Sequence, residues 1–204
     1  YLDAQIADHR AHPRDDLTSY LLDVELDGNK LGPEHVRGSI VLLLIAGIDT
    51  TWSAIGSSLW HLAGHPDDLE RLTDDPDVMM FAIEELLRAY APVTMARLVK
   101  DDVDFHGCPM RANEWVLLPF PAANRDPAFF EDADGFVIDR EANRHAAFGL
   151  GIHRCIGSNL ARLELRVAIE EFVGRFPRFE LAGDTRWSVG QIRGPRELPL
   201  RILA

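Results

Sequence analysis

The sequence predicts a mainly α-helical fold with a minor β part, which is the α+β class. Residues 33–64 form an apolar pattern long enough for one extended helix, and a second strongly helical segment begins at Ser158. Between them, residues 95–120 alternate in polarity and carry turn residues, as short strands do. The chain has 204 residues, of which 47% are hydrophobic, so it can bury a core without disulfides or a structural metal. No repeat or linker marks a second domain.

The first 28 residues are expected to be helical, and one long helix is expected to follow them. Pro33 suits a helix start, and the pattern continues to Gly64, where a His-Pro-Asp-Asp turn stops it. At 1.5 Å per residue this helix is roughly 45 Å long. Its middle is apolar nearly all round, which predicts a position inside a large protein with neighbours on every side. The rest of the chain supplies roughly half of those neighbours, and Tyr1 lies within a helical pattern. We therefore expect the N-terminal half of the domain to be absent from this chain.

The remaining elements follow from changes in pattern along the chain. Two helices are expected within residues 66–90, and short strands and hairpins within residues 95–120. An irregular Pro- and Asp-rich stretch then leads to FGLGIHRCIG at 148–157. The following helix should end at about Phe176, and the tail after it is β-like.

Charge and cysteine content limit the possible partners and compartment. The formal net charge is −12, which argues against a nucleic-acid partner. The apolar run Ile40–Ala46 is far short of the roughly 20 residues that a membrane span needs. Cys108 and Cys155 lie far apart and form no CxxC pair, which favours a reduced, cytoplasmic protein. We expect a soluble protein with no membrane association.

Cys155 lies among three glycines directly before a helix. A lone cysteine is most often a small buried apolar residue. Here the free N–H groups and the dipole of the next helix favour an anion, so the thiolate is the expected form. The glycines allow a flat, wide group to approach the backbone closely. A nucleophilic role with His153 as base is less favoured, because no third group orients the imidazole. Ligation of a metal or cofactor by the thiolate is the preferred interpretation.

The pattern Phe148-Gly149-x-Gly151-x-His153-x-Cys155-x-Gly157 resembles the haem-binding loop of the cytochrome P450 family. The resemblance implies that Cys155 is the axial, proximal ligand of the iron of haem b and pushes electron density toward bound oxygen. It further implies that Phe148 packs beside the sulfur. Arg97, His145 and His153 are implied to contact the haem propionates. The cofactor-binding residues implied by the resemblance are Arg97, His145, Phe148, Gly149, His153, Cys155 and Gly157.

A second motif, Ala46-Gly47-Ile48-Asp49-Thr50-Thr51, lies in the middle of the long helix. An acid in so apolar a stretch is costly unless it is paired or functional. From the residues alone, Thr50 could bond back to the Ala46 carbonyl and Asp49 could have a local partner. The segment also resembles the oxygen-activation motif of the same family. That resemblance implies that Gly47 supplies space over the haem and that Asp49 and Thr50 relay protons.

A third motif is the pair Glu85 and Arg88, spaced i, i+3 on a helix. On an exposed face such a pair contributes only about 0.2–0.5 kcal/mol, so the motif is weak by itself. It resembles the family's ExxR pair, which a downstream arginine completes, and Arg140 matches that position. The resemblance implies a buried structural network that holds the haem-loop side of the fold.

Other candidate sites have less support in the sequence. His61 and His65 are spaced i, i+4 but lack the glutamate of an HExxH zinc motif. Cys108 is expected to serve packing in a hairpin. The Gly149-Leu150-Gly151 triplet is not a dinucleotide fingerprint, because no GxGxxG follows a strand.

The order of the motifs resembles the C-terminal half of a soluble bacterial cytochrome P450 throughout. The resemblance implies an oxidoreductase, a monooxygenase that inserts one atom of dioxygen into a small apolar substrate. Electrons would come from NAD(P)H through a ferredoxin-type or fused reductase. Two alternatives stay open: a haem-thiolate peroxygenase, and a haem-binding fragment without catalytic activity. Peroxygenases usually replace the acid–alcohol pair, which the presence of Asp49 and Thr50 argues against. The chain by itself is expected to bind haem weakly or to misfold.

Overall fold

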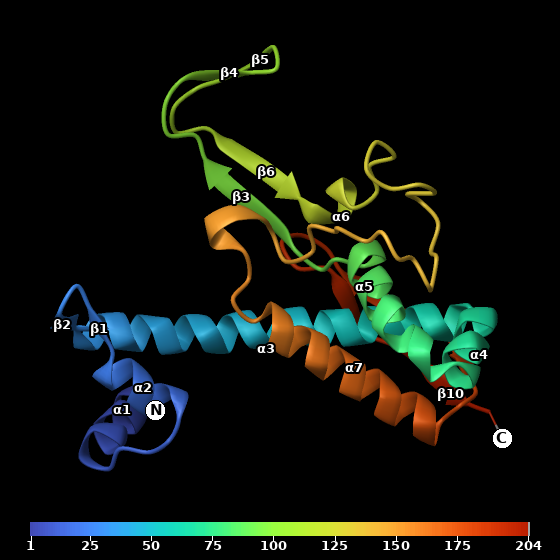
Figure 1. Cartoon of the computed structure of the whole chain (residues 1–204), viewed down its shortest axis with the longest axis horizontal. Helices are drawn as coiled ribbons and strands as arrows, with labels where there is room; N and C mark the ends of the chain where they lie inside the picture. The colour runs from blue at the N-terminus through green and yellow to red at the C-terminus, as the bar shows by residue number, and fades with distance from the viewer. Residues whose placement is uncertain (204) are drawn as a thin grey trace. The chain divides into compact units, whose positions relative to one another are not determined.

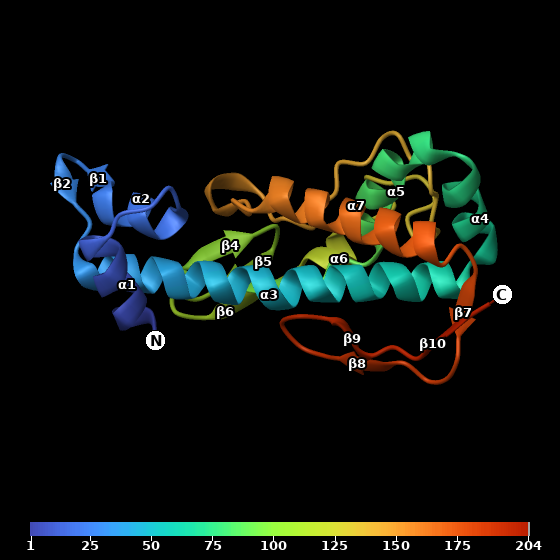
Figure 2. The same cartoon turned by 90° about the horizontal axis from the view of Figure 1, so that it is seen from below.

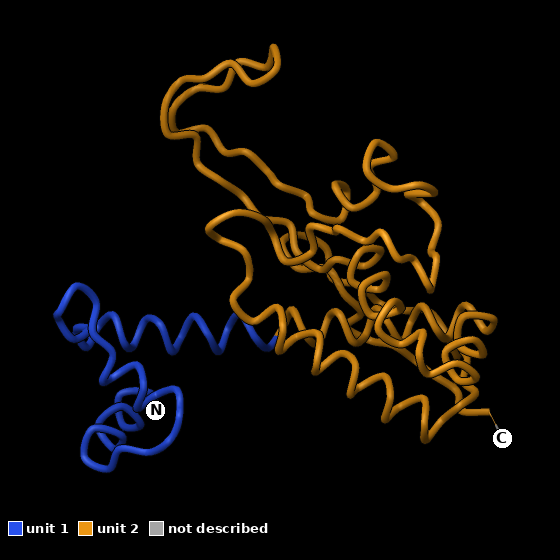
Figure 3. Tube along the Cα trace, in the orientation of Figure 1, with its two compact units in different colours: residues 1–48 blue, residues 49–204 orange. Residues whose placement is uncertain are grey.

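The computed structural model describes residues 1–203 and confirms the α+β class, with helices and short two-stranded sheets (Figure 1). The chain divides into two compact units, residues 1–48 and the residues from Asp49 onward (Figure 3). The unit boundary falls within one continuous helix.

The first unit begins with two short helices and a small hairpin. These elements are α1 (Leu2–Ala11), α2 (Leu17–Asp23), β1 (Glu25–Leu26) and β2 (Asn29–Lys30). Asp16 caps α2 by accepting a hydrogen bond from the Ser19 amide at 2.9 Å. The prediction of helix up to residue 28 is wrong at its end. Asp27 and Gly28 both have positive φ angles, of 52° and 76°, which suits a tight hairpin turn and stops a helix.

The long helix α3 (Pro33–Gly64) has the predicted bounds. Its middle, however, is open to solvent within the part of the chain that the structure describes. Leu42, Ile45, Ile48 and Trp52 are 67%, 66%, 62% and 60% exposed. The expectation that this apolar segment is too short for a membrane span is wrong by length and composition alone, since α3 passes that test; within residues 1–203 only 6% of its most apolar window is buried. The predicted enclosure of this helix is thus not provided by residues 1–203.

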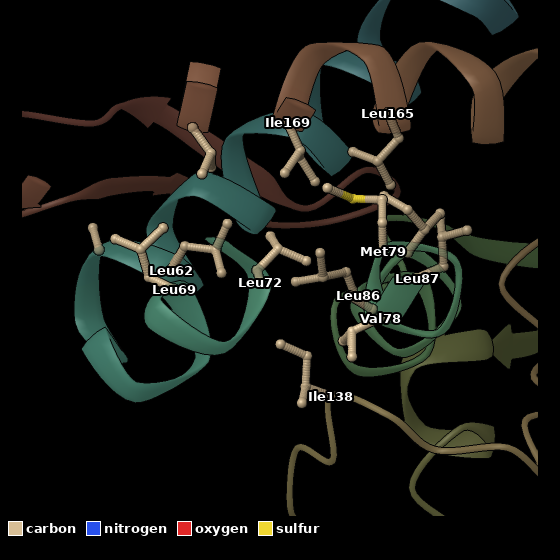
Figure 4. Close-up of a cluster of buried hydrophobic side chains, with 14 of the residues drawn as sticks. Leu62, Leu69, Leu72, Val78, Met79, Leu86, Leu87, Ile138, Leu165 and Ile169 are labelled. Carbon is tan, nitrogen blue, oxygen red and sulfur yellow. The ribbon is translucent and has the colours of Figure 1, made fainter. Parts of the chain in front are cut away.

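Four helices of the second unit enclose its hydrophobic core. Besides the C-terminal part of α3 they are α4 (Pro66–Asp74), α5 (Met79–Ala89) and α7 (Ser158–Arg175). Figure 4 shows Leu62, Leu72, Leu86, Leu165 and Ile169 converging from all four helices, and each is at most 3% exposed. Burying a leucine or isoleucine side chain stabilises a fold by about 1.5–3 kcal/mol. This core fixes α5, which carries the ExxR motif, against α7, which follows Cys155.

A β arm extends from the end of α5, as predicted for residues 95–120. Its strands are β3 (Thr94–Leu98), β4 (Val103–Phe105), β5 (Cys108–Met110) and β6 (Trp115–Pro119). β3 pairs antiparallel with β6, and the β4–β5 hairpin forms the tip of the arm (Figure 1). The tip turns at His106 and Gly107, which both have positive φ angles. A short helix, α6 (Phe120–Ala123), follows the arm.

The C-terminal tail is β-structured, as predicted, and part of it packs on α3. β7 (Phe179–Leu181) pairs with β10 (Leu200–Ile202), and β8 (Arg186–Ser188) pairs with β9 (Gly194–Glu197). The β8–β9 hairpin runs beside α3 on the side opposite α7 (Figure 2). The contact is close, because a Cβ added at Gly194 would lie 2.4 Å from the Cβ of Ser53. β9 therefore approaches α3 at a position where only glycine fits.

Candidate functional site

Cys155 lies in the tight loop between the 3₁₀ turn Gly151–His153 and helix α7. Its amide donates a hydrogen bond to the Phe148 carbonyl at 2.9 Å, which closes the loop on itself. Gly149 and Gly151 have φ angles of 68° and 70°, in the left-handed region that favours glycine. The Cys155 thiol is free and exposed. The loop thus presents a sulfur atom to solvent from a constrained backbone.

The residues around this thiol in sequence are apolar and exposed. Leu150, Ile152 and Ile156 are 73%, 97% and 92% exposed. A Cβ added at Gly157 would lie 3.9 Å from Sγ of Cys155, so a side chain there would contact the sulfur. A soft sulfur donor with apolar neighbours and little steric bulk suits a planar, apolar, metal-bearing group.

Three basic residues predicted to contact the cofactor occupy different environments. Arg97 lies on β3, half-buried, and donates to the Ala96 carbonyl at 2.8 Å. Within residues 1–203 no ion pair ties it to a carboxylate. His153 is exposed beside Cys155. His145 is different, since only 2% of its side chain is exposed. A propionate contact stays a prediction for all three residues.

Both ring nitrogens of His145 are engaged within the protein. The Ala147 amide donates to Nδ1 at 3.1 Å, so Nδ1 accepts and the proton is on Nε2. Nε2 then donates to Oε2 of Glu84 at 3.0 Å. The structure therefore fixes the ring of His145 by two hydrogen bonds, one of them to a side chain on α5.

Glu84 joins α5 to α7 through Arg162. Nε and Nη2 of Arg162 donate to the two carboxylate oxygens at 2.6 and 3.0 Å. The same guanidinium lies 4.7 Å above the ring of Phe148, in the cysteine loop. Burial raises the pKa of Glu84, but the hydrogen bonds from His145 and Arg162 outweigh it and lower that pKa to about 2. Sequence reasoning missed this network because His145 and Arg162 lie 61 and 78 residues after Glu84 in the sequence.

This pKa predicts that Glu84 stabilises the fold in a pH-dependent way. The folded-state pKa lies below the ordinary 4.5, so the contribution is complete above pH 4.5 and is lost as the pH falls toward 2. We expect Glu84→Gln to lower the free energy of unfolding by about 2 kcal/mol at pH 7. The difference from wild type should shrink below pH 4.5 in urea titrations. Glu171→Gln, which breaks the exposed Glu171–Arg175 pair, is the control. An E84Q deficit that is equal at pH 7 and pH 3.5 would contradict the assignment.

The ExxR residues form a fully buried network. Glu85 and Arg88 are both 0% exposed, and Nε and Nη2 of Arg88 donate to the Glu85 carboxylate at 2.7 and 2.8 Å. The remaining Arg88 donors reach three backbone carbonyls, those of Asn124, Ala133 and Gly135. All five N–H donors of this guanidinium are thus used.

Arg140 completes this network, as the sequence resemblance implies. Its Nε donates to Oε2 of Glu85 at 3.0 Å, and its other nitrogens donate to backbone carbonyls. The Val137 amide and the Asn143 side chain also donate to Glu85, at 2.8 and 3.0 Å. Burial raises the pKa of Glu85, and the bonds from Arg88 and Val137 outweigh it, so the net pKa is lowered. The network fixes the irregular chain that leads into the cysteine loop.

Asn124 is a member of this region that sequence reasoning did not single out. It is 0% exposed, its Nδ2 donates to the Arg88 carbonyl at 3.1 Å, and its Oδ1 accepts from the Ala146 amide at 2.7 Å. It therefore connects the ExxR helix directly to the start of the cysteine loop. Its position in the ANRDP stretch, between the β arm and the loop, was the available signal.

Asp49 has a partner that the sequence did not indicate. Arg196 on β9 donates to both carboxylate oxygens, through Nη1 to Oδ1 and through Nη2 to Oδ2, the latter at 3.0 Å. The Arg196 hydrogen bond lowers the pKa of Asp49, against a smaller opposing effect of burial. Gly47, two residues earlier on α3, has open space where a Cβ would lie. The acid of the helix motif is thus paired, although not with a neighbour in sequence.

His61 and Cys108, which have less support as site residues in the sequence, occupy two different environments. His61 is 0% exposed and bonds to the Tyr90 hydroxyl at 2.7 Å and to Asp68 at 2.9 Å. Burial lowers the pKa of His61. Cys108 is exposed on the β4–β5 hairpin rather than packed, so that prediction is wrong. Within the described residues, two of the three β5 residues, Cys108 and Pro109, are exposed.

The chain matches known proteins along nearly its whole length. Residues 2–188 match the family described as "Cytochrome P450". Over 99% of its length the chain is 37% identical to the polyketide biosynthesis cytochrome P450 PksS of Bacillus subtilis strain 168. Over 96% it is 39% identical to a steroid C26-monooxygenase of Mycolicibacterium smegmatis. The crystal structure of PksS superposes with a TM-score of 0.95 at 38% identity, covering 99% of this chain and 54% of that one. The chain spans about half the length of these curated relatives, 51% of the first and 50% of the second.

Proposed function

Because the chain belongs to the cytochrome P450 family, we propose that it is the C-terminal portion of a single haem-thiolate monooxygenase domain. The intact protein would insert one atom of dioxygen into a small apolar substrate, with electrons from NAD(P)H delivered by a ferredoxin-type or fused reductase. The observation that carries this proposal is the exposed Cys155 thiol, held in a loop closed by the Phe148 carbonyl. The protein would work in the cytoplasm without a membrane, as is consistent with the bacterial relatives.

The residues around Cys155 fit a haem. The thiol is unpaired, its neighbours Ile152 and Ile156 face solvent with apolar side chains, and Gly157 leaves the sulfur unobstructed. Cys155 would hold the iron. Arg97 and His153 would contact haem propionates. Each side chain can donate a hydrogen bond to a carboxylate, and neither has a carboxylate partner within residues 1–203. When bound, haem b would supply the redox chemistry that activates dioxygen, with the thiolate tuning the iron.

The protein groups of the α3 motif would supply protons. Thr50 Oγ1 can donate and accept a proton, and the Asp49 carboxylate can accept one and return it. General acid–base assistance of this kind accelerates a step by about 10²–10⁴. Gly47 would leave room beside the reacting group, because a Cβ there would meet no atom within 4 Å. The apolar side chains of α3 near this motif would exclude water and favour an apolar substrate.

Two other functions make different predictions. A haem-thiolate peroxygenase would take its oxygen from peroxide and would not need the Asp49–Thr50 pair. A haem-binding fragment would bind the cofactor without turnover. Purified full-length protein should show a thiolate-type Soret band in the reduced carbon-monoxide difference spectrum, and turnover with NAD(P)H and redox partners. Peroxide-only turnover would favour the first alternative, and haem without turnover the second.

Replacement of Thr50 by alanine is expected to uncouple the reaction. The variant should bind haem with an unchanged Soret band, because Thr50 would take part in proton delivery and not in holding the cofactor. Product formed per NAD(P)H consumed should fall at least tenfold, because protons would no longer be delivered at a defined position. Thr51→Ala, on the next residue of α3, is the matched control and should stay coupled. Equal coupling in T50A and wild type would remove Thr50 from the relay.

A further inference from the structure

Arg196 lies against the acid of the α3 motif as a two-pronged partner. Its Nη2 donates to Oδ2 of Asp49 at 3.0 Å, and its Nη1 donates to Oδ1. The two side chains are 27% and 37% exposed, so the pair is partly shielded from water. A bidentate contact orients the carboxylate as well as attracting it, because the planes of the guanidinium and the carboxylate must align.

The packing of β9 on α3 holds this contact in place. Asp49 and Ser53 are four residues apart and lie on one face of α3. Gly194 of β9 lies against Ser53 so closely that a Cβ on it would be 2.4 Å from the serine Cβ. The Gly194 amide donates a hydrogen bond to the Ser188 hydroxyl at 3.1 Å, which connects β8 to the same point of β9. Arg196, two residues further along β9, is thereby brought to Asp49.

Arg196 does not pair with Glu197, the acidic residue next to it in the sequence. Glu197 pairs instead with Arg186 on β8, an exposed contact on the same hairpin. The hydrogen bond from Arg196 is the main cause of the lowered pKa of Asp49, and burial acts in the opposite direction. Within residues 1–203, Arg196 of β9 is the charged side chain that acts on the pKa of Asp49.

We propose that Arg196 is a positioning residue for the proton relay: its two-pronged contact holds the Asp49 carboxylate in one direction, so proton uptake at Asp49 requires this ion pair to open. The inference rests on the proposed function, because Asp49 has a relay to serve only in a monooxygenase. It assigns a specific task to a residue of the C-terminal hairpin, 147 positions away from Asp49. The task is exerted through Asp49, which both Nη atoms of Arg196 contact.

The test is a titration of Asp49 in the full-length protein. Aspartate labelled with ¹³C at the side-chain carboxyl, assigned by loss of one signal in Asp49→Asn, reports the pKa directly. In Arg196→Met the pKa of Asp49 should rise toward the ordinary aspartate value, because the hydrogen bonds and charge of Arg196 that lower it are lost. Arg186→Met, which breaks the neighbouring Arg186–Glu197 pair, should leave it unchanged. The pH profile of product formed per NAD(P)H should shift in R196M by the same amount.

Charge and fold can be separated by two more variants. Arg196→Lys keeps the charge and should restore most of the wild-type titration, whereas Arg196→Gln should behave as R196M and replaces it if R196M does not fold. An Asp49 pKa unchanged by loss of Arg196 would overturn the proposal, and so would an equal shift in R186M. Absence of turnover in the wild-type protein would instead contradict the proposed function, because the titration is read without turnover.

Discussion

Replacement of Cys155 by serine is expected to abolish the haem-thiolate signature and the monooxygenase activity that we propose for the full-length protein. The thiol is exposed at the centre of a loop whose glycines and backbone bonds leave it free to bind. A serine hydroxyl is a much poorer ligand for the iron than a thiolate, since soft sulfur donors are what such sites select. The reduced carbon-monoxide spectrum should lose its thiolate band, and product formation should fall to background.

Cys108→Ser is the matched control for this experiment. Cys108 is the other cysteine of the chain and is also exposed, but it lies on the β4–β5 hairpin. Its replacement should leave the spectrum and the activity unchanged. A thiolate band that persists in C155S and vanishes in C108S would overturn the assignment of the ligand.

Replacement of Arg88 by alanine is expected to be the most destabilising of these substitutions. It leaves the fully buried Glu85 carboxylate without its two strongest donors and leaves three backbone carbonyls unpaired. Removing one partner of a buried ion pair lowers the free energy of unfolding by about 3–5 kcal/mol, which is a large fraction of a domain's stability. Urea unfolding monitored by circular dichroism should show this loss, or no folded protein should be recovered.

Two further variants make the Arg88 experiment specific. Arg88→Lys keeps the charge but cannot supply five planar donors, so most of the loss should remain. Arg175→Ala, which breaks an exposed i, i+4 pair on α7, should change the free energy of unfolding by less than about 0.5 kcal/mol. A loss in R88A as small as that in R175A would show that the network does not hold the cysteine-loop side of the fold.

The elements that sequence reasoning placed correctly are those with local signals. Proline and glycine mark both ends of α3, and the helix has those bounds. Alternating polarity marks the β arm, where β3 and β6 pair in register. The error at residues 25–28 arose because a turn that needs two positive φ angles overrode a helical composition. The expected enclosure of the α3 middle is not found within residues 1–203, and the chain spans about half of its relatives' length.

The sequence by itself determined the family, the cysteine loop and the Glu85–Arg88 pair, because glycine punctuation and i, i+3 spacing act between near neighbours. Only the tertiary structure decided that Arg196 pairs with Asp49 and that Glu84 receives Arg162 and His145. These partners are 61 to 147 residues apart. Such contacts form only where packed elements bring side chains together, as β9 does by its close approach to Ser53 of α3. Periodicity and residue spacing do not predict these contacts, because the contacts depend on how the surfaces of distant elements fit together.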